Sequence, residues 1–388
     1  MKLATLLRKS KRAVILVVLG VLAYIDYASC YVIAWKEVYH RHLTAAAIVF
    51  WVLLAMFQFL QFFYWAMIYI RGPGKIPRFK HFDLYETKSE GTAPVPDIFV
   101  CDEQGFPFWC SKCQNLKPDR LFHLSDLDMC VPRFDHFCLW IGTAIGRDNF
   151  ISFIKFLQFL NVYAILVLCF VSAFTRSILR NRPSWLPHFV ILFILGGFIF
   201  IVTLFLLIGI VKNTFSNSTS FDEITTRQAL SYKRWVEKHK KTNPRFAWCI
   251  GKMPRVELGI RFVNIAHDDT RKVVSFGVKD APYSNGFKAN LFNMCFKGNY
   301  NMNSTKDSVG VIAVLKSAYV VLVPFAEFFV GVKNNNTQTF QSHSDEFSPD
   351  FVRVIVTKIQ KQQFEYALYL SPPNNLDSRK SQMQDTSA

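Results

Sequence analysis

Residues 109–149 read WCSKCQNLKPDRLFHLSDLDMCVPRFDHFCLWIGTAIGRDN, and this stretch lies between two long apolar blocks. It contains four of the nine cysteines of the chain, Cys110, Cys113, Cys130 and Cys138. Clustering of this kind favours a metal site or a catalytic thiol over a disulfide framework, provided that the loop lies in a reducing compartment.

The first part of the loop offers a set of metal ligands. Cys110 and Cys113 form a C-x-x-C pair, and His123 and Cys130 follow at distances that a loop can bridge. Three thiolates and one imidazole are a common tetrahedral zinc set, and a closed set of four ligands is structural. The alternative is that the four are unrelated, small buried residues.

The second part of the loop offers a nucleophile in the sequence Asp135-His136-Phe137-Cys138. In an extended segment the side chains of His136 and Cys138 share a face. A thiol beside an imidazole can lose its proton and become a strong nucleophile. Asp135 would fix the imidazole tautomer if its carboxylate turns back towards His136, a geometry that adjacency alone leaves open.

Outside the loop the sequence predicts a membrane protein. Half of the residues are apolar, the mean hydropathy is +0.18, and the apolar residues concentrate in four blocks: 13–35, 44–70, 151–174 and 186–211. Each block is long enough to cross a bilayer about 30 Å thick. We therefore expect an all-α membrane protein with four transmembrane helices, a small zinc-bound cysteine-rich cytosolic domain at 71–149 and a cytosolic carboxy-terminal region at 212–388.

The formal net charge of +17 suits cytosolic segments held at an anionic membrane surface. Nucleic-acid binding is the alternative, but the basic residues flank the apolar blocks and form no separate arm, so we expect no nucleic-acid partner. Four spans place residues 1–12, the loop and the tail on one side. Arg176, Arg180 and Arg182, in the opposite loop, run against the positive-inside rule.

Two further tail features bear on topology. The apolar stretch 309–332 is interrupted by Lys316, Pro324 and Glu327, which favours an amphipathic or buried segment over a fifth span. On the cytosolic side the sequons beginning at Asn217, Asn303 and Asn335 would go unused.

The four blocks and the loop between the second and third resemble the DHHC protein acyltransferases, or palmitoyltransferases, in a divergent form similar to a fungal subgroup. Short motifs match in addition: Gly72-Pro73-Gly74, Lys117-Pro118-Asp119-Arg120, Thr219-Ser220-Phe221-Asp222, and a tail pattern of Pro282-Tyr283, Gly286, Asn290 and Phe296-Lys297-Gly298. Gly72 replaces the family's aspartate, and the motif at 219–222 is a degraded Thr-Thr-x-Glu.

The resemblance implies roles for the loop residues. Cys138 would be the nucleophile and His136 the base, with Asp135 beside it, while Cys110, Cys113, His123 and Cys130 would hold one structural zinc ion. A second zinc site of the family would fall on Leu124, Leu127, Phe137 and Ala144, none of which binds zinc. We expect an apolar cluster of Leu124, Leu127 and Phe137 to replace that metal. The catalytic set is intact, because the family's second histidine, here Phe137, is a metal ligand.

The implied reaction moves a long-chain acyl group from palmitoyl-CoA to Cys138, and then to cytosolic cysteines of membrane-associated proteins. Candidate partners for the CoA phosphates, or else solvated loop charges, are Lys117, Arg120, Arg133 and Arg147. The expected location is the plasma membrane or an endomembrane, in a multi-pass protein whose active site faces the cytosol.

Two other functions fit parts of the sequence. A catalytically inactive membrane adaptor would explain the degraded motif at 219–222 and the missing aspartate before Pro73. A transporter with a zinc-bound domain fits less well, because Asp26 is the only obvious acid in the four blocks and a transport path normally has more polar groups in the membrane.

Overall fold

The structure is a computed structural model that describes residues 2–41, 43–84, 91–181, 183–242, 260–268, 270–277, 280–296, 309–330 and 347–367. The chain divides into two compact units. The helical unit comprises Met1–Gly74, Phe134–Thr214 and Val311–Val332, and the sheet unit comprises Lys75–Arg133, Phe215–Gly310 and Lys333–Ala388. Residues Asn303 and Asn335 and the polar segment after residue 370 lie outside the described residues.

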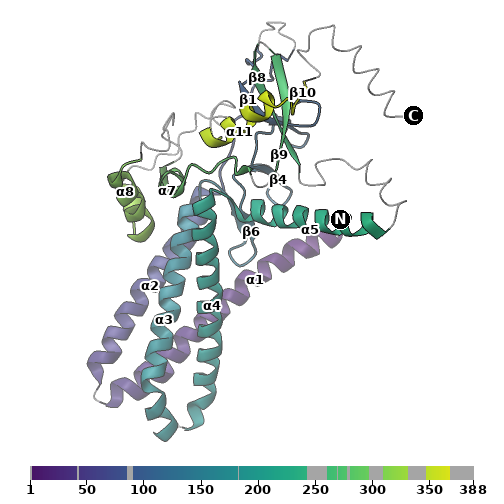
Figure 1. The fold of residues 1–388 in the computed structure, drawn as a ribbon. Helices are drawn as coiled ribbons and strands as arrows, with labels where there is room; N and C mark the ends of the chain where they lie inside the picture. Colours follow the sequence, from purple (N-terminus) through teal and green to yellow (C-terminus); the bar gives the residue numbers. More distant parts are fainter. Residues whose placement is uncertain are drawn as a thin grey trace. The chain divides into compact units, whose positions relative to one another are not determined.

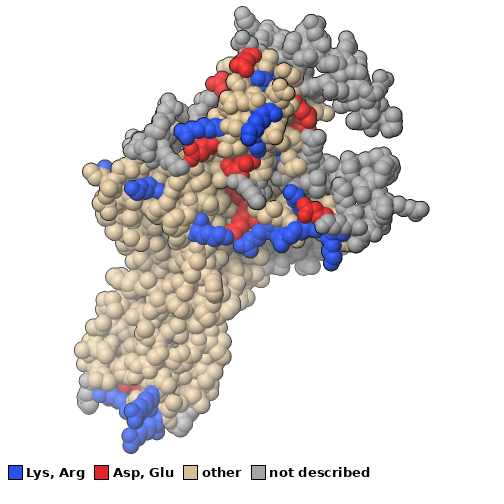
Figure 2. Space-filling view, in the orientation of Figure 1, with Lys and Arg blue, Asp and Glu red and all other residues tan. Residues whose placement is uncertain are grey.

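The helical unit is a bundle of long apolar helices (Figure 1). Its elements are α1 (Lys2–Asp26), the π-helix η1 (Tyr27–Val38), the 3-10 turn η2 (Tyr39–Arg41), α2 (Thr44–Arg71), α3 (Phe150–Asn181), the 3-10 turn η3 (Pro183–Trp185) and α4 (Leu186–Ser216). Among the described residues, four helices are long and apolar enough to cross a membrane: Ala13–Arg41, Thr44–Arg71, Phe150–Arg180 and Leu186–Ser216. Figure 2 shows no charged side chain on the middle of the bundle in this view.

The four spans agree with the predicted apolar blocks at their starts and run further at their ends. The third span continues to Arg180, so Arg176 and Arg180 lie on the last turns of α3 and not in a loop. At the same end of the bundle, Ser177 donates a hydrogen bond of 3.0 Å to Glu37, which also pairs with Arg41 at 2.7 Å. Glu37 and Arg41 thus have partners at the end of the first span.

Aromatic and polar contacts join the spans to each other. Phe50 on α2 and Phe170 on α3 stack with ring centroids 3.8 Å apart. Asp26 accepts hydrogen bonds from Tyr163 at 2.8 Å and from Gln58, so a single acid ties the end of α1 to α3 and α2. An acid inside the membrane is expected to be paired in this way, because an unpaired charge there is costly.

Four smaller elements also belong to the helical unit. Strands β6 (His136–Cys138) and β7 (Thr143–Ile145) form a hairpin, and the short helices α8 (Val311–Leu322) and α9 (Ala326–Phe329) follow from the tail. The 12 residues of α8 are too few to cross a bilayer, which takes about 20 helical residues.

The sheet unit contains a four-stranded antiparallel sheet in the order β1-β8-β9-β10. Its strands are β1 (Ile98–Cys101), β8 (Arg261–His267), β9 (Thr270–Phe276) and β10 (Glu365–Tyr366). Helix α11 (Pro349–Gln360) covers one face, where Phe351, Ile355 and Ile359 join a core with Val263 and Val274. A second core of Phe82, Phe99, Leu116, Phe262 and Val273 covers the other face.

Among its described residues, the sheet unit also contains two two-stranded hairpins and two helices. They are β2 (Trp109–Cys110) with β3 (Asn115–Leu116), β4 (Leu121–Leu124) with β5 (Met129–Pro132), α5 (Ser220–Thr242) and α7 (Phe287–Phe296). The predicted fold class, a mostly helical membrane protein with four spans and a cysteine-rich domain, is confirmed. The sheet unit adds a four-stranded sheet to the predicted all-α architecture.

Candidate active site and metal centre

The Asp-His-Phe-Cys sequence lies at the start of the β6–β7 hairpin in the helical unit. Across this hairpin His136 pairs with Ile145, Phe137 with Ala144 and Cys138 with Thr143. In the antiparallel strand His136 and Cys138 point to the same face, as the spacing of two predicts. The Cys138 carbonyl accepts a hydrogen bond of 2.7 Å from the Gly142 backbone N–H, which closes the turn just after the thiol.

Asp135 does turn back to reach the imidazole. Its Oδ2 lies 2.8 Å from Nδ1 of His136, and the Asp135 side chain is buried. The Asp135 backbone N–H donates to the Ile145 carbonyl at 2.9 Å, which fixes the residue at the strand end. The rings of His136 and Phe153 meet edge to face with centroids 5.3 Å apart. The imidazole is therefore oriented by a carboxylate on one side and by the first turns of α3 on the other.

The electrostatics of the pair favour a protonated imidazole. Burial alone would lower the pKa of His136, but hydrogen bonds and charge interactions with Asp135 and Cys138 raise it from 6.5 to about 9. An imidazolium next to a cysteine stabilises the thiolate, the nucleophilic form of that side chain. The arrangement thus places a protonated imidazole two residues before Cys138 on the same strand.

Neighbouring residues that the sequence analysis did not single out anchor the hairpin. Gly142 has a φ of +89°, and a Cβ there would meet the side chain of Ile15 and, at 3.0 Å, the hydroxyl of Tyr69. Tyr69 donates a hydrogen bond to the Ile141 carbonyl. Asn149 accepts from the Gly146 N–H at 3.0 Å and donates to the carbonyls of Ala144 and Ile68, at 2.9 and 3.3 Å. Asn149 directly precedes α3, and an asparagine just before a helix is a recognisable cap signal.

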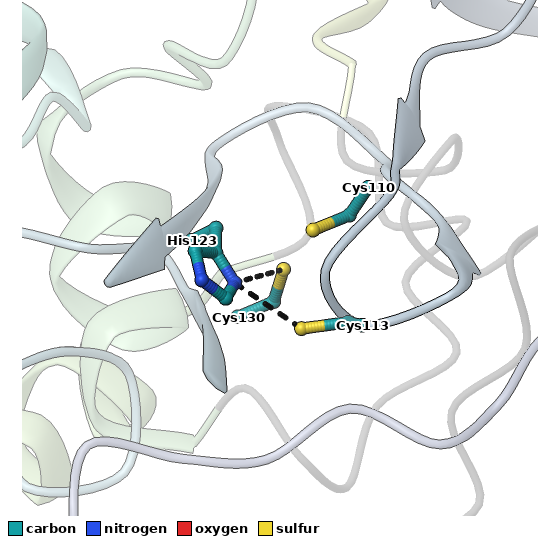
Figure 3. A group of neighbouring side chains, drawn as sticks. All are labelled: Cys110, Cys113, His123 and Cys130. Carbon is teal, nitrogen blue, oxygen red and sulfur yellow. Dashed lines mark hydrogen bonds between the residues drawn. The ribbon is translucent and has the colours of Figure 1, made fainter. Parts of the chain in front are cut away.

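The four predicted metal ligands converge in the sheet unit (Figure 3). Their ligand atoms all lie within 4.8 Å of one another. Cys113 Sγ and Cys130 Sγ are 3.3 and 3.9 Å from Nδ1 of His123. His123 and Cys130 are paired across the β4–β5 hairpin, whereas Cys110 ends β2 and Cys113 follows in the turn.

This set fits a zinc ion. Zn–S and Zn–N bonds of about 2.3 and 2.0 Å in a tetrahedron place sulfur and nitrogen about 3.6 Å apart, and two sulfurs about 3.8 Å apart. The separations of Cys113 and Cys130 from His123 bracket the first value. The four residues could hold a metal ion with no ligand position left open.

The residues that match the family's second zinc site belong to different units. Phe137 and Ala144 face each other across the β6–β7 hairpin of the helical unit. Leu124 ends β4 in the sheet unit, and its carbonyl accepts from the Leu127 N–H at 3.2 Å. The predicted apolar cluster of Leu124, Leu127 and Phe137 stays a prediction.

The motif at 219–222 forms hydrogen bonds between its first and last residues. The Thr219 hydroxyl accepts from the Asp222 N–H at 3.1 Å, and the Asp222 carboxylate accepts from the Thr219 N–H at 3.0 Å. This reciprocal pair is a capping box at the start of α5. Asp222 also pairs with Arg120 at 3.3 Å. The aspartate therefore keeps a structural role, which removes one of the grounds for an inactive adaptor.

Arg120 and the tail motif belong to the same framework. The Arg120 guanidinium lies 3.7 Å from the centre of the Tyr283 ring and donates to the Asn217 carbonyl. Asn217 donates to the Tyr283 carbonyl at 2.7 Å, and Asn290 donates to the Phe215 carbonyl at 2.7 Å. The Arg120 side chain thus interacts with other residues of the protein and is a weaker candidate for binding CoA phosphates. Asn217 is buried and its side-chain nitrogen donates the hydrogen bond to Tyr283, so that nitrogen is not accessible for glycosylation at this sequon.

The remaining candidates for CoA contacts differ in their surroundings. Arg147 pairs with Asp148 at 2.6 Å, and Lys117 lies 5.9 Å from the ring centre of Phe122.

Comparison with known proteins identifies a family model and several relatives that match this chain. The family model of DHHC palmitoyltransferases matches residues 103–227. "Palmitoyltransferase PFA5" of Candida albicans is 35% identical over 377 residues, which are 92% of each chain. The protein of the same name from Eremothecium gossypii is 40% identical over 169 residues, which are 41% of this chain and 46% of that protein. The one from Saccharomyces cerevisiae is 31% identical over 189 residues, which are 45% of this chain and 50% of that protein. The capping box, the metal cluster and the Asp-His-Phe-Cys hairpin all fall inside the matched region. This chain therefore belongs to the DHHC palmitoyltransferase family and is a protein S-acyltransferase.

Proposed function

We propose that Cys138 is the nucleophile that carries the acyl group, with His136 as its proton partner and Asp135 as the residue that orients the imidazole. The observation that carries this proposal is the 2.8 Å contact between Asp135 and His136, with Cys138 two residues further along the same strand. The proposal places a carboxylate, an imidazole and a thiol in the order in which nucleophilic catalysis uses them.

The reaction would proceed in two balanced steps. The Cys138 thiolate attacks the thioester carbonyl of palmitoyl-CoA, the bond to CoA sulfur breaks, and the His136 imidazolium gives its proton to the departing thiolate. Neutral His136 then takes the proton of a substrate cysteine, whose sulfur attacks the acyl-enzyme. The Cys138 thiolate leaves beside the restored imidazolium. Splitting the transfer in this way is covalent catalysis and predicts ping-pong kinetics.

The metal ion would be zinc, bound by Cys110, Cys113, His123 and Cys130 as a structural ion. A closed set of four ligands supplies folding energy and no open position for substrate. The donor types and their separations support this assignment.

The substrates would be palmitoyl-CoA and cytosolic cysteines of membrane-associated proteins. The four spans suggest a bilayer, and an acyl chain gains about 0.8 kcal/mol for each CH₂ that it buries there. The active site would face the cytosol, together with both chain ends, at the plasma membrane or an endomembrane. A glycosylation reporter fused after Ala388 would then remain unmodified, and its efficient modification would contradict this topology.

A transfer assay tests the proposed roles. Purified protein is incubated with palmitoyl-CoA and then with a cysteine-containing peptide, and both acyl-enzyme and acyl-peptide are quantified. Cys138→Ala should abolish both, while Cys169→Ala, which removes an exposed cysteine on α3, should leave both unchanged. Acyl-peptide formation by Cys138→Ala at the rate of the parent would refute the assignment.

A further inference from the structure

Helix α8 has its apolar face on the outside. Large apolar side chains recur at one stripe of this helix, and their exposed fractions are 67% for Val311, 71% for Ile312, 62% for Leu315, 45% for Tyr319 and 66% for Leu322. Lys316 lies among them and is also exposed. Ser317 and Val320, on the opposite stripe, are buried. A helix that packs on a protein and faces water shows the reverse pattern, with apolar residues inside and polar residues outside.

The chain after α8 makes a turn that contacts α2. Phe325 adopts a φ of +62°, and α9 then begins at Ala326. The ring of Phe325 lies 5.0 Å from that of Phe63 on α2, and Phe328 lies 6.3 Å from the same ring. Residues 311–330 thus contain two short helices joined by a turn, and the turn and the second helix pack against α2.

A buried ion pair holds this segment to the bundle. Lys155 of α3 is fully buried, and its Nζ contacts the carboxylate of Glu327, the Val323 carbonyl at 2.7 Å and the Tyr64 hydroxyl at 3.4 Å. The Tyr64 hydroxyl also accepts from the Phe325 N–H at 2.8 Å. Every proton of the ammonium group therefore has an acceptor, which a buried charge requires.

The position of the pair along the spans gives its depth. Lys155 lies five residues after the first residue of α3, and Tyr64, which it contacts, lies seven residues before the last residue of α2. At 1.5 Å per residue, the Lys155–Glu327 pair is therefore roughly 8–10 Å inside these helix ends. The 28 residues of α2 measure about 42 Å, or roughly 6 Å more at each end than a 30 Å hydrocarbon core. The pair thus falls near the boundary between headgroups and acyl chains.

We propose that residues 311–330 are embedded in one leaflet of the bilayer as a half-inserted segment, with lipid acyl chains covering the exposed stripe of α8 and the Lys155–Glu327 pair as its anchor. The occupant is lipid because five exposed residues of α8 are large and apolar, because the segment packs against the spanning helix α2, and because its anchor lies where acyl chains begin. The exposed Lys316 on the same stripe can extend its ammonium group to the headgroups while its methylene stem stays among the acyl chains. If this stripe faced water, the free-energy cost would grow in proportion to its exposed apolar area.

Fluorescence quenching in nanodiscs tests the proposal on the full chain. Leu315 is replaced by an azide-bearing residue and labelled there, so that the native cysteines stay intact. The matched control carries the label at Val354, an apolar residue of α11 that is 38% exposed in the sheet unit. Lipids with a nitroxide at carbon 5 should quench the label at 315 at least about threefold more strongly than the label at 354, and aqueous iodide should do the opposite.

Two outcomes would overturn the proposal. Equal iodide quenching at both positions would mean that α8 faces water. Protection of position 315 from both quenchers would mean that protein, such as a second copy of the chain, covers it.

The anchor is tested with the same label at position 315. Glu327→Met leaves the Lys155 ammonium buried without its carboxylate, and we expect it to lose more than half of the lipid quenching. Lys155→Met combined with Glu327→Met removes both charges and should restore that quenching, because apolar replacement of a whole buried pair is tolerated better than loss of one partner. Full lipid quenching in the single variant would show that the pair is not the anchor.

Discussion

At the scale of single residues, the Asp135–His136 contact sets the protonation state of the site. Because the pKa of His136 is raised to about 9, the imidazolium contributes stability that is fully present below pH 6.5 and is lost as the pH rises towards 9. The same proton is the one that the departing CoA thiolate receives in the proposed first step. Acylation should therefore be sustained up to about pH 9 and decline above it.

Substituting the carboxylate tests this relation. Asp135→Asn removes the negative charge that raises the pKa of His136, so the alkaline decline should move to lower pH and the acylation rate should fall by about 10²–10⁴-fold. Rates of acyl-enzyme formation across about pH 6 to 10 measure both effects. An unchanged alkaline limb in the variant would mean that His136 is not the group that titrates.

Phe137 tests the reason for the departure from the family signature. Phe137→His rebuilds the Asp-His-His-Cys sequence, but the opposite residue, Ala144, offers no metal ligand. The new polar ring should cost about 1–3 kcal/mol of stability and bring no gain in activity. Thermal unfolding and acyl transfer of the purified variant provide the measurements. A large gain in transfer would identify Phe137 as a catalytic lesion.

At the scale of elements, the β6–β7 turn is held against the spans by Gly142. Gly142→Ala adds a Cβ at a positive φ and against Ile15 and Tyr69, so we expect a loss of about 1–3 kcal/mol in stability and reduced acylation. Gly197→Ala is the matched control, because nothing lies within 4 Å of a Cβ at that position in α4. Equal thermal midpoints for both variants would show that the turn tolerates a side chain.

The β4–β5 hairpin and the C-x-x-C turn are expected to fold around one metal ion. Elemental analysis of purified protein should give about one zinc per chain, and Cys113→Ser should lose both the metal and folded protein, since structural metal binding is folding energy. Cys138→Ala should keep the metal, because Cys138 lies outside the cluster. Two zinc ions per chain would mean that a second ligand set has been overlooked.

Elements with a strong local signal were predictable and the others were not. The four spans follow from apolar runs, whereas their ends depend on partners such as Glu37 and Ser177 that sequence does not reveal. The cluster of candidate metal ligands was predictable because His123 and Cys130 follow the C-x-x-C pair at distances that a loop can bridge. The sheet was missed because β1 pairs with β8 more than 150 residues later. The β8–β9 hairpin did carry a signal, two seven-residue strands around Asp268, whose φ is +51°.

At the scale of the whole molecule, the chain joins a membrane bundle, which holds the proposed catalytic hairpin, to a sheet unit, which holds the metal cluster. The sequence shows this division only indirectly, because each unit is assembled from three separate stretches. The motif at 219–222 illustrates the limit. By its letters it is degraded, but in space Thr219 and Asp222 cap α5 and Asp222 binds Arg120.

The central claim is that Cys138 carries the acyl group. The most direct test is peptide mass spectrometry of the purified, full-length protein after brief incubation with palmitoyl-CoA, with and without hydroxylamine, which cleaves thioesters. We predict one palmitoyl group on the peptide that contains Cys138, sensitive to hydroxylamine and lost when an acceptor peptide is added. Transfer to the acceptor with no adduct on Cys138, or with the adduct on another cysteine, would contradict the account.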